Sequence, residues 1–76
     1  MNNIRRKKLQ EIDDRICVIQ SDIEWIKDEE EEYKDNIPEN LQGSERYEKA
    51  EDCVYRLDEA IEYLENVLDA IREAQD

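Results

Sequence analysis

The chain has 76 residues, 45% of them charged, and its 23 Asp and Glu outnumber its 11 Lys and Arg for a net charge of −12. It contains no histidine, which excludes His-dependent catalysis and His-ligated metal sites. A single Gly and a single Pro argue against an all-β or loop-rich fold. The longest apolar run, Ile16 to Ile19, is too short to span a membrane. A chain this short buries only a modest core and is marginally stable alone.

The first predicted element is a helix over about residues 4–35. It carries a stripe whose members are spaced alternately three and four residues apart: Leu9, Ile12, Ile16, Ile19, Ile23, Ile26, Glu30 and Tyr33. Such spacing is typical of an amphipathic helix in a left-handed coiled coil. Glu30 is the one charged member of the stripe.

Residues 36–44 hold the only Pro and the only Gly, and they predict the connection between two helices. Asn36, with Glu39 three residues later, predicts a capping box for one short turn. Gly43 suits the left-handed conformation that ends such a turn. Ser44 is the predicted N-cap of the second helix.

The second predicted helix covers about residues 45–75. Its stripe repeats the same spacing: Tyr47, Ala50, Val54, Leu57, Ile61, Leu64, Leu68 and Ile71. Because the connection is short, the two helices are antiparallel neighbours, and the lengths of helix and turn predict that Ile19 faces Ile61. The sequence therefore predicts an all-α fold in which residues 1–76 form one antiparallel two-helix coiled-coil hairpin.

A second, weaker stripe predicts self-association. Small or apolar residues recur at every seventh position of the second helix, beside the seam: Cys53, Ala60, Val67 and Ala74. On the first helix, Val18 and Trp25 lie away from the seam, where Trp25 would leave a large apolar area in water. We expect these surfaces to meet in a homodimer that forms a four-helix bundle. The alternative is a monomeric hairpin with a few exposed apolar residues.

Neither the cysteines nor the carboxylates predict catalysis. Cys17 and Cys53 are offset by about ten residues in the hairpin, roughly 15 Å, which is too far for a disulfide. We expect both thiols to stay reduced, as is usual in cytoplasmic proteins. The acidic run 28–32 lacks the alternating ligands and the glycine of a calcium loop. We expect no enzymatic activity, no cofactor, no bound metal and no membrane association.

The charge is unevenly distributed along the chain. Four basic residues lie within residues 1–8, at the end where the C-terminus of the second helix presents its negative dipole, so we do not expect direct nucleic-acid binding. The acidic remainder keeps the protein soluble, or it imitates the phosphate backbone and binds a protein partner with a basic groove. The predicted partner-facing carboxylates are Asp28, Glu29, Glu31, Glu32, Glu51, Asp58, Glu62 and Glu65.

The segment Asn36–Glu48, with the sequence NIPENLQGSERYE, is followed by heptads of Asp, Glu, Leu, Ile and Ala. It resembles a family of short acidic helical-hairpin proteins from clostridia-like bacteria and their phages or prophages. The resemblance implies a phage-linked setting, in which a small inhibitor of a host nuclease or anti-phage defence complex is an expected function. The sequence itself favours a non-enzymatic protein–protein interaction module that self-associates, with the acidic inhibitor as the alternative.

Overall fold

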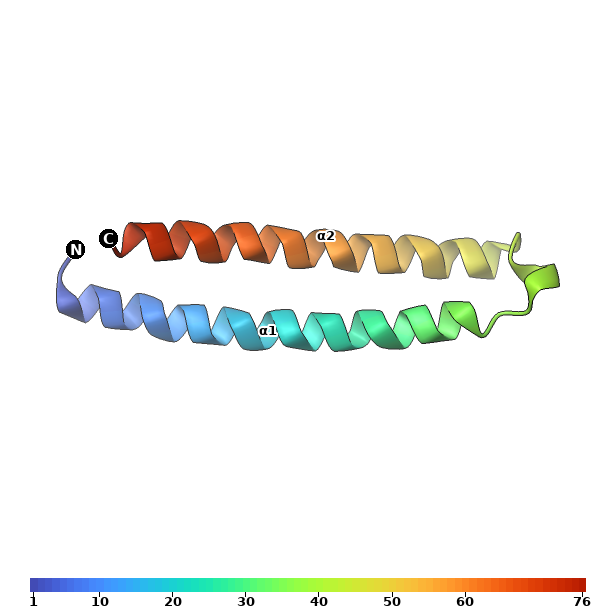
Figure 1. Ribbon diagram of the computed structural model, residues 1–76, viewed down its shortest axis with the longest axis horizontal. Coiled ribbons are helices and arrows are strands. Elements are labelled where there is room, and N and C mark those ends of the chain that lie inside the picture. The colour runs from blue at the N-terminus through green and yellow to red at the C-terminus, as the bar shows by residue number, and fades with distance from the viewer.

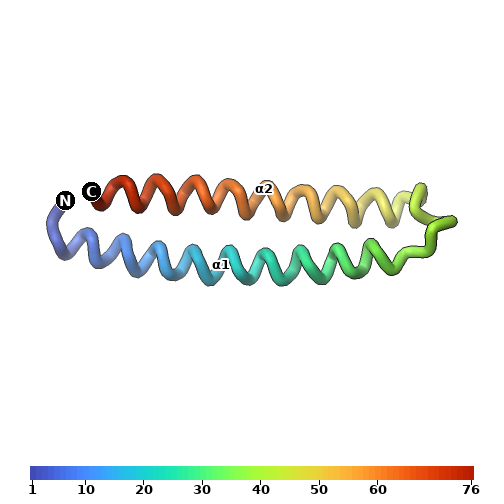
Figure 2. Tube along the Cα trace, viewed as in Figure 1, coloured from blue at the N-terminus to red at the C-terminus, as the bar shows by residue number.

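A computed structural model describes all 76 residues and shows two helices packed against each other, with no strands (Figure 1). Helix α1 spans Asn3–Asp35, the 3-10 turn η1 spans Glu39–Leu41, and helix α2 spans Glu45–Ala74. The helices run in opposite directions, so both termini lie at one end of a rod and η1 lies at the other (Figure 2). The rod measures 59 × 15 × 12 Å. The predicted all-α helical hairpin is confirmed.

Both long helices begin at a side-chain cap. The Oδ1 atom of Asn2 accepts a hydrogen bond from the N–H of Arg5 at 2.8 Å. The Oγ atom of Ser44 accepts one from the N–H of Tyr47 at 3.3 Å, which confirms the predicted N-cap of α2. Two acidic residues in the first turn of α2 add a favourable interaction with the positive end of the helix dipole.

Asn36 has a different role from the predicted one. It ends α1 instead of capping the short turn, because its backbone is still helical, with φ −85° and ψ −5°. Its N–H donates to the carbonyl oxygen of Glu32 at 3.1 Å, and the N–H of Ile37 donates to the carbonyl oxygen of Lys34 at 3.1 Å, which continues the last turn of α1. The predicted capping box with Glu39 is therefore wrong, and η1 begins after Pro38 without a side-chain cap.

Gly43 is not left-handed, contrary to the prediction, because no residue of the chain has a positive φ. The backbone of η1 makes the turn with its own hydrogen bonds. The N–H of Gln42 donates to the carbonyl of Glu39 at 3.2 Å, and the N–H of Ser44 donates to the carbonyl of Leu41 at 3.0 Å. The chain thus reaches α2 through right-handed and extended conformations alone.

The core is a thin seam between α1 and α2. Its buried residues are Ile37, Ala50, Val54 and Leu68. The other aliphatic residues that face across the seam are only partly buried, because a two-helix hairpin has no third layer to cover them. Neither helix contains an apolar stretch of the length needed to cross a lipid bilayer.

Contacts across the seam agree with the predicted register. The side chain of Gln20 donates to the carbonyl oxygen of Ile61 at 3.3 Å, directly beside the predicted pair of Ile19 and Ile61. At the end of the rod that holds both termini, Nε of Arg6 donates to the carbonyl oxygen of Gln75 at 2.7 Å. The basic N-terminal segment therefore lies at the negative end of the α2 dipole, as expected.

Helix α1 is rotated about its own axis relative to the prediction. Two of its predicted seam residues, Ile19 and Ile26, are 50% and 53% exposed. In their place, the polar residues Asp13, Gln20 and Lys27 lie partly buried against α2. Helix α1 thus presents two rows to α2: the apolar row Leu9, Ile16 and Ile23, and this polar row. Its other apolar row, which contains Ile19 and Ile26, lies at the edge of the seam.

Candidate functional site

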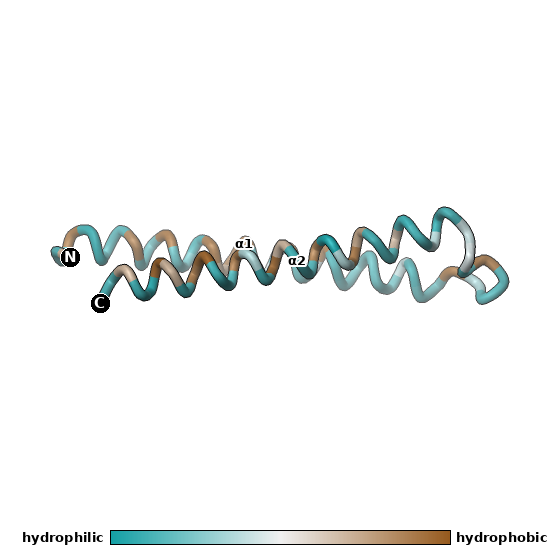
Figure 3. The backbone as a smooth tube through the Cα atoms, turned by 90° about the horizontal axis from the view of Figure 1, so that it is seen from above, coloured by the Kyte–Doolittle hydropathy of each residue, from teal (hydrophilic) through white to brown (hydrophobic).

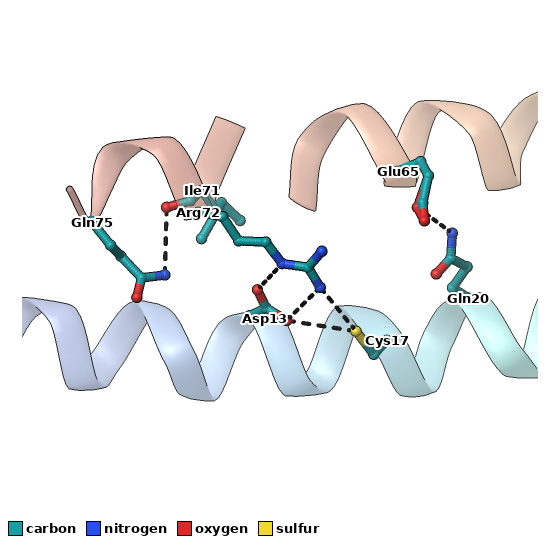
Figure 4. A network of polar contacts seen from close by, with 7 residues as sticks. All are labelled: Asp13, Cys17, Gln20, Glu65, Ile71, Arg72 and Gln75. Atoms are coloured by element: carbon teal, nitrogen blue, oxygen red, sulfur yellow. Dashed lines mark hydrogen bonds and ion pairs between the residues drawn. The ribbon is translucent and has the colours of Figure 1, made fainter. Parts of the chain in front are cut away.

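One long side of the hairpin is closed by polar pairs, and we call it the paired edge. It consists of Asp13 with Arg72, Gln20 with Glu65, and Lys27 with Asp58. Figure 4 shows the first two of these pairs reaching across from one helix to the other. The pairs recur every seven residues, so one rotation of α1 brings all three into reach. This repeated complementarity explains why α1 turns its polar row toward α2.

The ion pairs of the paired edge are short. Nε of Arg72 lies 2.8 Å from Oδ2 of Asp13, and Nζ of Lys27 lies 2.8 Å from Oδ1 of Asp58. The hydrogen bond from Arg72 lowers the pKa of Asp13, although partial burial opposes it. The hydrogen bond to Asp58 raises the pKa of Lys27. Asp13, Arg72 and Lys27 are therefore charged at neutral pH.

Cys17 lies on the paired edge. Its Sγ donates to Oδ1 of Asp13 at 3.5 Å and lies 3.9 Å from Nη2 of Arg72 (Figure 4). Partial burial, followed by the Asp13 carboxylate, raises the pKa of this thiol. A protonated thiol is a weak nucleophile. Cys17 and Cys53 are both free, and the surroundings of Cys17 do not activate it.

The predicted acidic surface is divided by these pairs. Asp58 and Glu65 are already engaged within the hairpin, so they are not free partner-facing groups as predicted. The others form no ion pair in the hairpin: Asp28, Glu29, Glu31, Glu32, Glu51 and Glu62. Glu31 is partly buried and the rest are exposed. Figure 3 shows that the half of the rod near η1 is mostly hydrophilic.

The opposite long side exposes apolar side chains, and we call it the open edge. It consists of Ile19, Ile26, Cys53, Ala60 and Val67. Because the paired edge fixes one side of each helix, heptad geometry places the α1 row and the α2 row together on the other side. Val67 is 44% exposed, and Cys53 and Ala60 are partly buried. A single hairpin does not cover this edge.

The structure places the predicted interface residues in three settings. Cys53, Ala60 and Val67 belong to the open edge. Val18 and Trp25 lie beside that edge on α1, 61% and 69% exposed.

The last predicted interface residue, Ala74, lies in the third setting, exposed at the end of α2. The sequence reasoning missed Ile19 and Ile26 as surface residues, because it assigned them to the hairpin seam. The signal that could have identified them is the polar row Asp13, Gln20 and Lys27. These residues lie four positions after Leu9, Ile16 and Ile23, and they complement polar side chains of α2.

A shallow hollow lies near η1. It is lined by Glu30, Tyr33, Arg46, Lys49 and Ala50. The guanidinium of Arg46 lies 5.1 Å from the ring centroid of Tyr33 and also donates to its hydroxyl. Glu30 and Ala50 share this hollow, which agrees with the predicted register, because a register that pairs Ile19 with Ile61 also places Glu30 opposite Ala50. No group of three or more Cys, Asp or Glu side chains is placed to hold a metal ion.

Comparison of the chain with protein-family models, curated proteins and solved structures found no match. What the molecule can do therefore follows from its own surfaces. An apolar strip along two helices, flanked by charged side chains, fits the face of another helix or helix pair. The open edge is accordingly the candidate functional site.

Proposed function

We propose that the protein is a non-enzymatic protein–protein interaction module that self-associates through its open edge into a four-helix bundle. The exposure of Ile19 and Ile26 carries this proposal, because these residues continue a regular heptad stripe and yet remain half exposed. Full burial of one such side chain contributes about 1.5–3 kcal/mol. Because Ile19 and Ile26 are already half buried in the hairpin, a second copy that covers the open edge recovers about half of this free energy for each of these residues on each chain.

The dimensions of the rod support a second copy as the partner. A face 59 Å long and 15 Å wide offers an area of about 900 Å². Stable interfaces bury roughly 800 Å² on each partner, so the face is large enough. A hairpin of this size is also marginally stable alone, and docking two hairpins is a common way for such chains to complete a core.

Mutation of the open edge tests the proposal. We expect Ile19→Glu to convert the dimer to a monomer, because the dimer would bury the new carboxylate twice. Ser21→Glu is the matched control, since Ser21 is exposed on the same helix and lies outside the open edge. Sedimentation equilibrium gives the mass, and circular dichroism checks that both variants stay helical. An unchanged mass for helical Ile19→Glu would reject the interface.

The unpaired carboxylates support a second candidate function. Asp28, Glu29 and Glu32 are exposed and have no cation within 4.0 Å. Carboxylates spread along a rod create a negative potential like that of a phosphate backbone. We propose, as the alternative to self-association, that this surface occupies the basic groove of a nuclease or of an anti-phage defence complex.

A binding experiment across a salt series tests the acidic surface. We expect the immobilised protein to retain a nuclease from host lysate at low salt and to release it as salt screens the charges. The double variant Glu29→Gln, Glu32→Gln should lose the nuclease, whereas Glu73→Gln at the far end of the rod should keep it. Retention of the nuclease that does not change with salt concentration, or that persists in the double variant, would contradict this function.

A further inference from the structure

We infer that the second copy docks with its connection over the termini of the first, so that α1 packs antiparallel on the other α1 about a two-fold axis at Ile19 and Ala60. The inference rests on the proposed self-association and adds the orientation and register of the two copies. The open edge, the charges that flank it and the charges of the two rod ends carry it.

The charged row beside the open edge is self-complementary. On α1 this row consists of Lys8, Arg15, Asp22 and Glu29, at intervals of seven residues. All four are exposed, and none forms an ion pair within the hairpin. In an antiparallel contact of two α1 helices centred near Ile19, the basic half of each row meets the acidic half of the other. Lys8 then lies opposite Glu29 of the second copy.

In the same contact Arg15 lies opposite Asp22 of the second copy. The two-fold axis repeats both pairs, so every member of the row is matched. Exposed ion pairs contribute little to affinity. Complementary charges do select the orientation of docking, because the wrong orientation brings like charges together.

The apolar row of α1 has the same centre. Ile12, Ile19 and Ile26 are spaced by seven residues, so antiparallel docking about Ile19 places Ile19 on Ile19 of the second copy and Ile12 on Ile26 of the second copy. Each isoleucine therefore meets another isoleucine.

The open-edge row of α2 is centred at the same level of the rod. Docking about Ala60 places Ala60 on its own copy and Cys53 on Val67 of the second copy. The hydrogen bond from Gln20 to the carbonyl of Ile61 shows that Ile19 and Ala60 lie at nearly one level of the hairpin. A single two-fold axis thus serves both helices, and the small Ala60 side chain lets the two α2 helices approach closely.

The opposite orientation, with both connections at one end, fits less well. It would lay α1 on α2 of the second copy, whose open-edge row is uncharged. The basic residues beside that row, Lys49 and Arg56, already form ion pairs within their own helix. The opposite orientation would also bring the acidic run 28–32 of both copies to the same end of the bundle. Like charges at close range repel, so the charge distribution favours connections at opposite ends.

A spin-label distance between the two connections tests the orientation. We would place a label at Gln42→Cys in a Cys17→Ala, Cys53→Ala background, since Gln42 is exposed in the connection. Electron–electron double resonance should give a distance close to the 59 Å length of the rod. Connections at one end would give roughly 10–20 Å, because packed helix axes lie 8–10 Å apart.

The mass of the same cysteine-free background separates the two proposals. A dimer with a long label distance supports the inference. A dimer with a short distance overturns the orientation and leaves self-association intact. A monomer overturns the proposed function and the inference together.

Disulfide trapping tests the register. In the same background, Ile19→Cys should form a disulfide-linked dimer under mild oxidation, because the axis brings the two thiols together. Ile26→Cys is the matched control, since it lies about 10 Å along the helix from the axis and its two copies are about 20 Å apart. Trapping of the control in preference to Ile19→Cys would overturn the register.

Discussion

The two long edges of the hairpin follow the same seven-residue period and yet have opposite chemistry. On the paired edge, Asp13, Gln20 and Lys27 meet complementary side chains of α2. On the open edge, Ile19 and Ile26 stay half exposed. The difference indicates that polar complementarity, and not the apolar stripe alone, sets the rotation of α1. It also leaves one apolar row half exposed, and the proposed self-association rests on that row.

The largest expected effect concerns the seam that lies between the two edges. Leu68 is 1% exposed, so Leu68→Ala should cost about 2–5 kcal/mol of unfolding free energy through lost burial and a residual cavity. Urea denaturation followed by circular dichroism measures it. Leu41→Ala is the matched control, because Leu41 is 46% exposed in η1 and should lose far less. Equal losses for the two variants would contradict the assignment of the core.

The next largest effect concerns the open edge. The unfolding temperature of the wild type should rise with protein concentration, because a dimer is stabilised by mass action. Ile26→Asp should remove this dependence, since the lost burial of two isoleucines and the burial of two carboxylates per dimer together cost about 3 kcal/mol or more, roughly a 100-fold weaker dimer. Asp14→Asn, outside both edges, should keep it. A wild-type unfolding temperature that is independent of concentration would count against the open edge as an interface.

Most of the fold could be predicted from the sequence because helix period, proline position and the Ser44 cap are local signals. The register followed from stripe phase and loop length, and the hydrogen bond from Gln20 to Ile61 agrees with it. The rotation of α1 could not be read from the apolar stripe, since that stripe is wide enough to pack in two ways. The choice depends on pairs such as Lys27 with Asp58, which are distant in sequence.

The candidate site was predictable in part for the same reason. The small residues Cys53, Ala60 and Val67 stood out as a stripe, but their neighbours Ile19 and Ile26 are identified only when the rotation of α1 is known. The conformation of Gly43 was also beyond the sequence, because the hydrogen bonds of η1 make a left-handed residue unnecessary.

A smaller effect tests the connection. Gly43 has no positive φ, and a Cβ atom there would meet nothing within 4 Å. Gly43→Ala should therefore stabilise the protein by about 0.4–1 kcal/mol, because alanine restricts the unfolded chain. Thermal unfolding monitored by circular dichroism measures the change. A destabilised variant would instead indicate that Gly43 adopts the left-handed conformation predicted from the sequence.

The smallest effect concerns the paired edge and depends on pH. Arg72 lowers the pKa of Asp13 below its usual value of 3.8, so the ionised carboxylate favours the folded state. This contribution is present above about pH 4 and is lost as pH falls through the lowered pKa. The difference in unfolding temperature between wild type and Asp13→Asn should therefore shrink between pH 6 and pH 2. A difference that widens on acidification would show that the pair does not stabilise the fold.

The mass of the wild-type protein in solution shows whether two copies associate. Sedimentation equilibrium across a concentration series should show a species of twice the 9.2 kDa chain mass if a second copy covers the open edge as proposed. A mass of 9.2 kDa at every concentration would contradict the account, since Ile19 and Ile26 would then remain in water.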